Sequence, residues 1–151
     1  MMNYSLISKQ LEGLIETEPF YVPALSNAAA ILWEELDDIN WAGFYIVRDE
    51  KLVLGPFQGK VACIHIALGK GVCGTAWEKD ETLVVPDVHE FKGHIACDSA
   101  SRSEIVVPIH HDGKVVAVLD IDSPSPSRFS SEDKTGLEEF AGVIEKMVTF
   151  N

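Results

Sequence analysis

The chain has 151 residues, of which 24 are acidic and 12 are basic, so its formal net charge is −12. Such an acidic protein repels phosphate backbones and anionic lipid headgroups, and its basic residues are scattered along the chain, which argues against nucleic-acid and membrane partners. A chain of this length folds most simply as one domain, with a core large enough to need no disulfide support.

The sequence shows no sign of export or of membrane insertion. The first residues lack the basic segment and the apolar run of a secretory signal, and no apolar stretch approaches the ~18 residues that a membrane span requires. We therefore expect a cytoplasmic protein, in which cysteines stay reduced and disulfides are transient and catalytic. Three cysteines, an odd number, suit a reactive set better than a paired framework.

Two amphipathic helices are predicted at the start of the chain. Apolar residues recur at helical spacing over residues 3–17 and again over residues 22–36, with a break at Glu18–Pro19 between them. The pattern then changes to that of a β-hairpin, with strands at residues 41–47 and 52–54 on either side of a polar turn.

The middle of the chain is predicted to consist of short elements joined by irregular segments. A loop near 15 residues long in a compact domain is usually functional or disordered. The predicted elements are a turn at residues 55–59, a strand at 62–66, a helix at 72–79, a strand at 82–85 and a loop over most of 88–102.

The last third of the chain is predicted to form a hairpin followed by a long helix. Its strands at residues 103–109 and 115–121 flank an Asp112–Gly113 turn. The closing helix, residues 132–148, follows the capping residue Ser130. This order of elements predicts an α+β fold in one domain, residues 1–151: an antiparallel sheet with helices mainly on one face and a small-molecule pocket on the other.

The residues in this sequence that are able to carry out chemistry are its thiols and a group of carboxylates. A thiolate attacks soft electrophilic centres and a second thiol resolves the product as a disulfide, although a single cysteine is more often a small core residue. Asp120 and Asp122 lie two apart on a predicted strand, so both side chains project from the same face. Converging carboxylates repel one another, which raises at least one pKa and retains a proton near neutrality. The groups concerned are Cys63, Cys73 and Cys97, and Glu104, Asp120 and Asp122.

Several motifs together resemble the free methionine-(R)-sulfoxide reductase family, whose members have a GAF-like domain. The similarity covers nearly the whole chain and matches three cysteines and three carboxylates in order and spacing. The segments that carry it are WAGFY (41–45), GKVACIHI (59–66), GKGVCG (69–74), ACD (96–98), SEIVVPI (103–109) and GKVVAVLDIDS (113–123).

The resemblance implies reduction of free methionine (R)-sulfoxide to methionine. Cys97 would attack the sulfoxide sulfur and become a sulfenic acid, Cys63 would resolve it as a disulfide, and Cys73 would be an auxiliary thiol. Thioredoxin would reduce the disulfide, with NADPH acting indirectly through thioredoxin reductase. No cofactor or metal would be bound, and the protein would be a homodimer.

The resemblance also implies a binding site for the substrate. Its ammonium group and the proton for its sulfoxide oxygen would be handled by Glu104, Asp120 and Asp122. Its methyl end would be enclosed by Trp41 and Tyr45.

Two other classes of function compete with this interpretation. Cys63, His65, Cys73, His94 and Cys97 are zinc-type ligands, but their spacing lacks the paired knuckles of structural zinc sites. A sensory GAF module that binds a small ligand and acts on a partner in trans is the alternative, although such modules are usually attached to an output domain.

Overall fold

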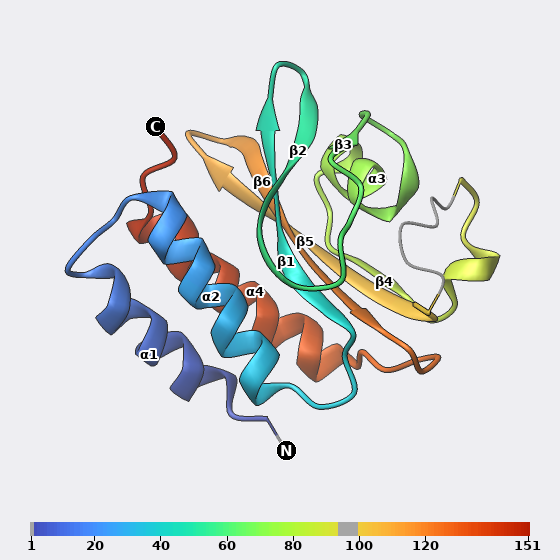
Figure 1. Cartoon of the computed structure of the whole chain (residues 1–151), viewed down its shortest axis with the longest axis horizontal. Coiled ribbons are helices and arrows are strands. Elements are labelled where there is room, and N and C mark those ends of the chain that lie inside the picture. Colours follow the sequence, from blue (N-terminus) through green and yellow to red (C-terminus); the bar gives the residue numbers. More distant parts are fainter. Residues whose placement is uncertain (1, 94–99) are drawn as a thin grey trace.

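The structure is a computed structural model that describes residues 2–93 and 100–151. In this part of the chain, six strands form one antiparallel sheet in the order β3-β2-β1-β6-β5-β4 (Figure 1). The strands are β1 (Trp41–Arg48), β2 (Lys51–Gly59), β3 (His65–Ile66), β4 (Leu83–Val85), β5 (Ser103–His111) and β6 (Lys114–Ser123). The helices are α1 (Tyr4–Ile15), α2 (Tyr21–Glu35), α3 (Gly71–Lys79) and α4 (Ser131–Met147), with a 3-10 turn, η1, at Val88–Glu90.

The two faces of the sheet are covered differently, which confirms the predicted α+β arrangement. Helices α2 and α4 lie against one face, and α1 packs on those two helices (Figure 1). The other face carries the short helix α3 and irregular connections. Within the described residues, no helix combines the length and apolarity needed to cross a membrane.

Alternation along the central strands produces two separate apolar clusters. On β1, Phe44 joins the core beneath the helices, whereas Trp41 and Tyr45 join a second cluster on the opposite face. On β6, Leu119 and Ile121 are fully buried in the helix-side core. The face predicted for Asp120 and Asp122 is therefore the one that points away from α2 and α4.

The turn predicted at residues 55–59 is wrong, because β2 continues through these residues to Gly59. The register changes from Tyr45 opposite Leu54 to Gly43 opposite Phe57, so two residues of β2 face one residue of β1. This bulge accommodates the Gly55–Pro56 pair. Among the described residues β3 pairs only with positions 52 and 53 of β2, so Pro56 sits on a free edge where its missing N–H is tolerated.

The strand predicted at residues 62–66 is also wrong in extent, since β3 comprises only His65 and Ile66. Side chains of β1 bind the preceding backbone in place of a neighbouring strand. The indole N–H of Trp41 donates to the Lys60 carbonyl at 3.1 Å, and the Tyr45 hydroxyl donates to the Cys63 carbonyl at 2.9 Å. Cys63 therefore lies in a loop and not on a strand.

The remaining predicted elements need smaller corrections. The loop predicted from Val88 includes the 3-10 turn η1, which begins after Asp87, whose side chain accepts a hydrogen bond from the His89 amide. Asp112 and Gly113 have φ values of 52° and 76°, as a tight hairpin turn requires. Ser130 and Asp133 cap α4 reciprocally, and the helix begins at Ser131.

Candidate active site

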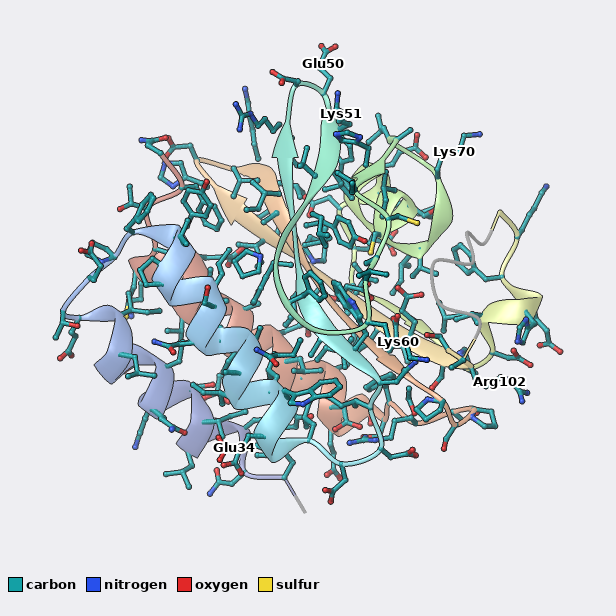
Figure 2. All side chains as sticks on the ribbon, viewed as in Figure 1. Glu34, Glu50, Lys51, Lys60, Lys70 and Arg102 are labelled. Atoms are coloured by element: carbon teal, nitrogen blue, oxygen red, sulfur yellow. The ribbon has the colours of Figure 1, made fainter. Side chains whose placement is uncertain are left out.

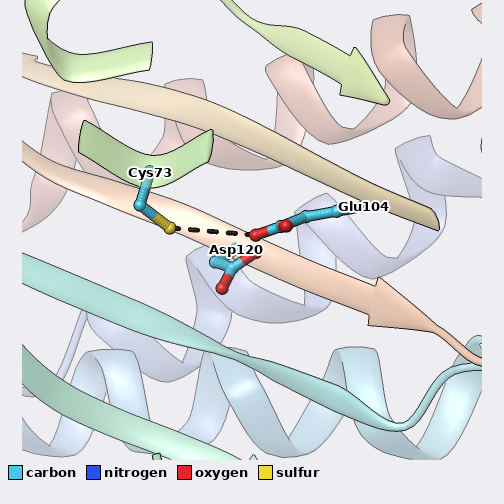
Figure 3. A group of neighbouring side chains, drawn as sticks. All are labelled: Cys73, Glu104 and Asp120. Atoms are coloured by element: carbon cyan, nitrogen blue, oxygen red, sulfur yellow. Dashed lines mark hydrogen bonds between the residues drawn. The ribbon is translucent and has the colours of Figure 1, made fainter. Parts of the chain in front are cut away.

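The three predicted carboxylates meet on the face of the sheet opposite α2 and α4. Glu104 of β5 lies directly across from Asp122 of β6, and Asp120 lies two positions before Asp122 on the same strand. Cys73, the third residue of α3, approaches them from above the sheet (Figure 3). The sulfur of Cys73 and one oxygen each of Glu104 and Asp120 lie within 4.8 Å of one another.

A cavity of about 50 Å³ opens beside these groups. It brings together six of the eight residues that the sequence singled out, whereas Cys63 is not part of its wall and Cys97 lies outside the described residues. The predicted residues in the wall are Trp41, Tyr45, Cys73, Glu104, Asp120 and Asp122. The residues in the wall that sequence reasoning missed are Val61, Ala62, Ile66, Lys70, Gly71, Val72 and Ser101.

The carboxyl groups are held in an environment that favours their protonated forms. Burial raises the pKa of Glu104 well above its ordinary value, and the nearby charges of Asp120 and Asp122 raise it further. Burial and the charge of Asp120 act in the same direction on the pKa of Asp122. Burial also raises the pKa of Asp120, but hydrogen bonds from Glu104, Asp122 and Cys73 to its carboxylate counteract the rise. Asp120 is therefore the preferred place for negative charge, with proton-bearing neighbours around it.

Cys73 is a buried, protonated thiol. Its residue is 5% exposed, and its sulfur makes a weak hydrogen bond of 3.9 Å to Oε2 of Glu104. Burial raises the pKa of the thiol well above its ordinary value, and the charges of Asp120 and Glu104 add to the effect. A thiol in this state is a poor nucleophile, because the thiolate is the reactive form.

Ser101 supports the carboxylates from the edge of the cavity. Its hydroxyl lies 3.3 Å from Oδ2 of Asp122 and accepts a hydrogen bond of 3.3 Å from the Asn40 side-chain amide. The Asn40 backbone N–H in turn donates to the Asp122 carbonyl. A single serine in a segment rich in small polar residues carries no distinctive signal, which is why the sequence did not reveal it.

Aromatic rings form one wall of the site. The Trp41 and Tyr45 rings are stacked at 5.9 Å between centroids, and the ring of Phe57 on β2 also stacks with Trp41 at 5.1 Å. Trp41 and Tyr45 are both nearly fully buried. Such flat, apolar surfaces suit a small methyl or thioether group, and the nearby carboxyl groups suit a cation.

Two carboxyl oxygens in the site are still able to accept hydrogen bonds, which indicates a ligand with several hydrogen-bond donors. Within the described residues, Oδ1 of Asp120 and Oδ1 of Asp122 are buried and have no hydrogen-bond partner. Buried acceptors of this kind are rare in folded proteins because an unpaired group costs roughly 1–3 kcal/mol. An ammonium group or a protonated ligand oxygen at the cavity would satisfy them.

Cys63 lies at the edge of this region. It is half-buried, packs against the cluster that contains Trp41 and Tyr45, and is disulfide-bonded, whereas Cys73 is a free thiol. The hydrogen bond from Tyr45 to its carbonyl links the Cys63 backbone directly to the aromatic wall.

The raised pKa of Glu104 predicts a dependence of stability on pH. The folded state keeps a proton that the unfolded state has already lost, so the free energy of unfolding falls as pH rises above the unfolded pKa of about 4.3. We expect Glu104→Gln to remove part of this loss, raising the urea midpoint relative to wild type at pH 8 but much less at pH 5. The exposed Glu34→Gln on α2 serves as the control, with urea unfolding measured at both pH values. Parallel pH profiles for wild type and Glu104→Gln would contradict the proton-holding role.

Comparison with known proteins agrees with this geometry. The sequence matches the GAF domain family over residues 24–148. It is 47% identical to the free methionine-R-sulfoxide reductase of Escherichia coli, in an alignment that covers 96% of this chain and 88% of the relative.

Two solved structures are similar over nearly their whole length. The fRMsr of Staphylococcus aureus in its reduced form is 54% identical, with a TM-score of 0.95 and coverage of 99% of this chain and 97% of that one. The free methionine-R-sulfoxide reductase of Neisseria meningitidis in complex with its substrate is 45% identical, with a TM-score of 0.92 and coverage of 95% and 87%. The chain therefore belongs to the GAF-domain family and, within it, to the group of the free methionine-R-sulfoxide reductases.

Proposed function

We propose that this protein reduces free methionine (R)-sulfoxide to methionine. The observation that carries the proposal is the cavity in which three buried carboxyl groups with raised pKa face an aromatic wall. Its acidic side suits the ammonium group and the sulfoxide oxygen, and its aromatic side suits the methyl thioether end. The identity to reductases that act on this substrate supports the same conclusion.

The proposed reaction begins at Cys97. Its thiolate bonds to the sulfoxide sulfur while a carboxyl group protonates the sulfoxide oxygen. The hydroxyl then passes to the cysteine sulfur as the new sulfur–sulfur bond breaks, so that methionine leaves and Cys97 becomes a sulfenic acid. Cys63 then attacks the sulfenic sulfur, which releases water and forms the disulfide. Two observations support this pairing: Cys63 is disulfide-bonded, and Cys73 is a free, buried thiol.

We assign different roles to the groups that surround the substrate. Asp120 holds the ammonium group as a carboxylate, whereas Glu104 and Asp122 retain protons for the sulfoxide oxygen. Protonated Cys73 acts as an auxiliary thiol that donates to the carboxylates. The raised pKa values of these groups support this division.

The disulfide is returned to the dithiol by thioredoxin, which draws electrons from NADPH through thioredoxin reductase. We propose that the protein acts in the cytoplasm, together with that system, as a homodimer. The assay that tests the function is therefore thioredoxin-coupled NADPH consumption, run separately on the free (R) and (S) epimers and on a peptide that contains the sulfoxide. Turnover confined to the free (R) epimer is expected, and no turnover of that epimer would remove the proposal.

A sensory role with a nucleotide ligand is less consistent with the cavity. Nucleotide phosphates are anionic, and the carboxylate of Asp120 in the cavity wall would repel them. The same carboxylate attracts the ammonium of an amino acid.

N-acetylation of the substrate should lower turnover at least tenfold. The acetyl group removes the ammonium charge, and a hydrogen bond to a charged group is worth roughly 1.5–3 kcal/mol, where 1.4 kcal/mol corresponds to a factor of about ten. The values of kcat/KM for free and N-acetyl methionine (R)-sulfoxide give the ratio directly. Equal values would show that the carboxylates do not hold the ammonium.

Chelation should leave the reaction unchanged, since we propose that no metal participates. Cys73, Glu104 and Asp120 lie close enough to offer three ligands, but their raised pKa values mean that a metal must displace protons from them. We expect full activity in EDTA and substoichiometric zinc by elemental analysis of the purified protein. Activity lost on chelation and restored by zinc would replace the thiol mechanism with a metal-dependent one.

A further inference from the structure

One long segment of this acidic chain contains no acidic residue. From Lys51 to Trp77 there is no Asp or Glu, although the chain has 24 of them. The same segment contributes Lys51, Lys60 and Lys70, which all lie on the sheet side of the molecule, whereas Glu34 lies on the helical side (Figure 2). The segment around Cys63 therefore contributes only positive charge to its surroundings, on a protein whose net charge is −12. The carboxylates next to it come from outside the segment, Glu50 beside Lys51 and Glu78 beside Gly69.

The connection from Lys60 to Lys70, here termed the Cys63 loop, also exposes apolar side chains. Val61 is 89% exposed, Ile64 is 61% exposed and Leu68 is 48% exposed. Val61 and Ile64 lie within two residues of the half-buried Cys63 in the sequence, and Leu68 lies five residues after it. Neither Ile64 nor Leu68 contributes to the wall of the cavity. Exposed apolar residues gathered around a reactive group and rimmed by charge are typical of a protein interaction site.

We propose that the Cys63 loop is the docking surface for the dithiol reductase that recycles this enzyme, a thioredoxin-class protein with an acidic surface around its reactive thiols. The proposal rests on the proposed function, because only an enzyme that ends its cycle as a disulfide needs such a partner. Apolar contacts at Ile64 and Leu68 hold the partner, and Lys60 and Lys70 attract its acidic residues.

Docking at this surface would allow thiol–disulfide exchange between the reductase and the enzyme. The attacking thiolate of the reductase bonds to the sulfur of Cys63, the enzyme disulfide breaks, and the other enzyme cysteine leaves as a thiolate. The second thiol of the reductase then displaces Cys63. Two electrons and two protons pass from the reductase dithiol to the enzyme disulfide.

The charge and the position of the Cys63 loop favour a dithiol reductase over the substrate or a second copy of this chain as its binding partner. Substrate enters the cavity, and the exposed tips of Ile64 and Leu68 lie outside that wall. Complementary charge raises association rates, which suits a partner that must bind, exchange electrons and leave in every cycle. A second copy of this chain would not need to contact a disulfide at all.

The test is a pair of matched double variants. Lys60→Glu with Ile64→Ser alters the Cys63 loop, and Lys9→Glu with Leu6→Ser makes the same changes on α1. The match is close, since Leu6 is 62% exposed and Ile64 is 61% exposed. Each protein is assayed at saturating methionine sulfoxide with increasing concentrations of a reduced acidic thioredoxin, and separately with dithiothreitol, which needs no docking surface.

We expect kcat/KM for thioredoxin to fall at least tenfold in the loop variant and to stay at the wild-type value in the α1 variant. Turnover with dithiothreitol and the single-turnover yield of methionine should be unchanged in both. Added salt should lower kcat/KM for thioredoxin more in the wild type than in the loop variant, because the variant has already lost the attraction.

Other outcomes would overturn the proposal. An unchanged kcat/KM for thioredoxin in the loop variant would exclude docking there, and an equal loss with dithiothreitol would show that the loop acts on the chemistry of the enzyme. Dissociation of a dimer by the loop variant alone, measured by sedimentation, would assign the surface to a second copy of this chain. Absence of methionine from a single turnover of the wild type would instead remove the proposed function itself.

Discussion

Replacement of Cys97 by serine should abolish the formation of methionine, even in a single turnover. A serine hydroxyl is far less nucleophilic toward sulfur than a thiolate, so no sulfenic acid forms and no methionine leaves. The same substitution at Cys63 should have a different effect, because Cys63 is proposed to act only after methionine has left. Reduced Cys63→Ser should release one methionine per active site and then fall at least tenfold below wild type in thioredoxin-supported turnover.

The measurement is rapid quenching of pre-reduced enzyme with excess sulfoxide, followed by quantification of methionine. Mass spectrometry of the wild type after the reaction should find a Cys63–Cys97 link. The double variant Cys63→Ser, Cys73→Ser tests whether Cys73 can replace Cys63 as the resolving thiol. Because the pKa of Cys73 is raised, we expect Cys73 to rescue little of the turnover that Cys63→Ser loses, so the double and single variants should be similar. Methionine formed by Cys97→Ser would mean that a different residue is the nucleophile.

Glu104→Gln should lower kcat by about 100-fold or more, because general acid catalysis contributes roughly 10²–10⁴ to such reactions. The amide keeps the size of the side chain but cannot deliver a proton. In the wild type, the raised pKa keeps Glu104 protonated above its ordinary range. The single-turnover rate should therefore be high while Glu104 is protonated. It should fall as the pH rises through the pKa of Glu104 in the folded protein.

The pH dependence of the single-turnover rate checks this assignment. The variant should lose the alkaline limb that Glu104 contributes, while Glu34→Gln keeps the wild-type profile. A Glu104→Gln enzyme with wild-type kcat and an unaltered profile would show that the proton comes from elsewhere. Because the same substitution is expected to stabilise the fold at pH 8, a loss of activity there could not be attributed to unfolding.

The carboxylate face illustrates what could be predicted from local sequence. Alternation along a strand is a property of the backbone, so Asp120 and Asp122 had to share one face, with Leu119 and Ile121 on the other. The structure confirms that Leu119 and Ile121 are fully buried beneath the helices. Helix capping by Ser130 and the Asp112–Gly113 turn are equally local, since each depends on residues within a few positions.

The path of the chain around Cys63 depended on contacts that sequence spacing does not contain. Residues 55–59 look like a turn, yet they pair with β1 because a bulge absorbs the extra residue. Residues 62–66 look like a strand, yet Tyr45 binds the Cys63 carbonyl, Trp41 binds the carbonyl of Lys60 just before this segment, and Cys63 lies in a loop. Both outcomes depend on a partner strand distant in sequence, and tertiary contacts of this kind override local propensity.

By itself, the sequence determined the order and type of most elements, the shared face of two carboxylates and the family to which the motifs belong, because these depend on local spacing. Only the tertiary structure decided that Cys73 is buried against Glu104 and Asp120, and that Ser101 and Asn40 reach Asp122. These contacts join residues from α3, β5, β6 and the segments between them. Their pKa values follow from burial and mutual charge, which exist only once the chain has folded.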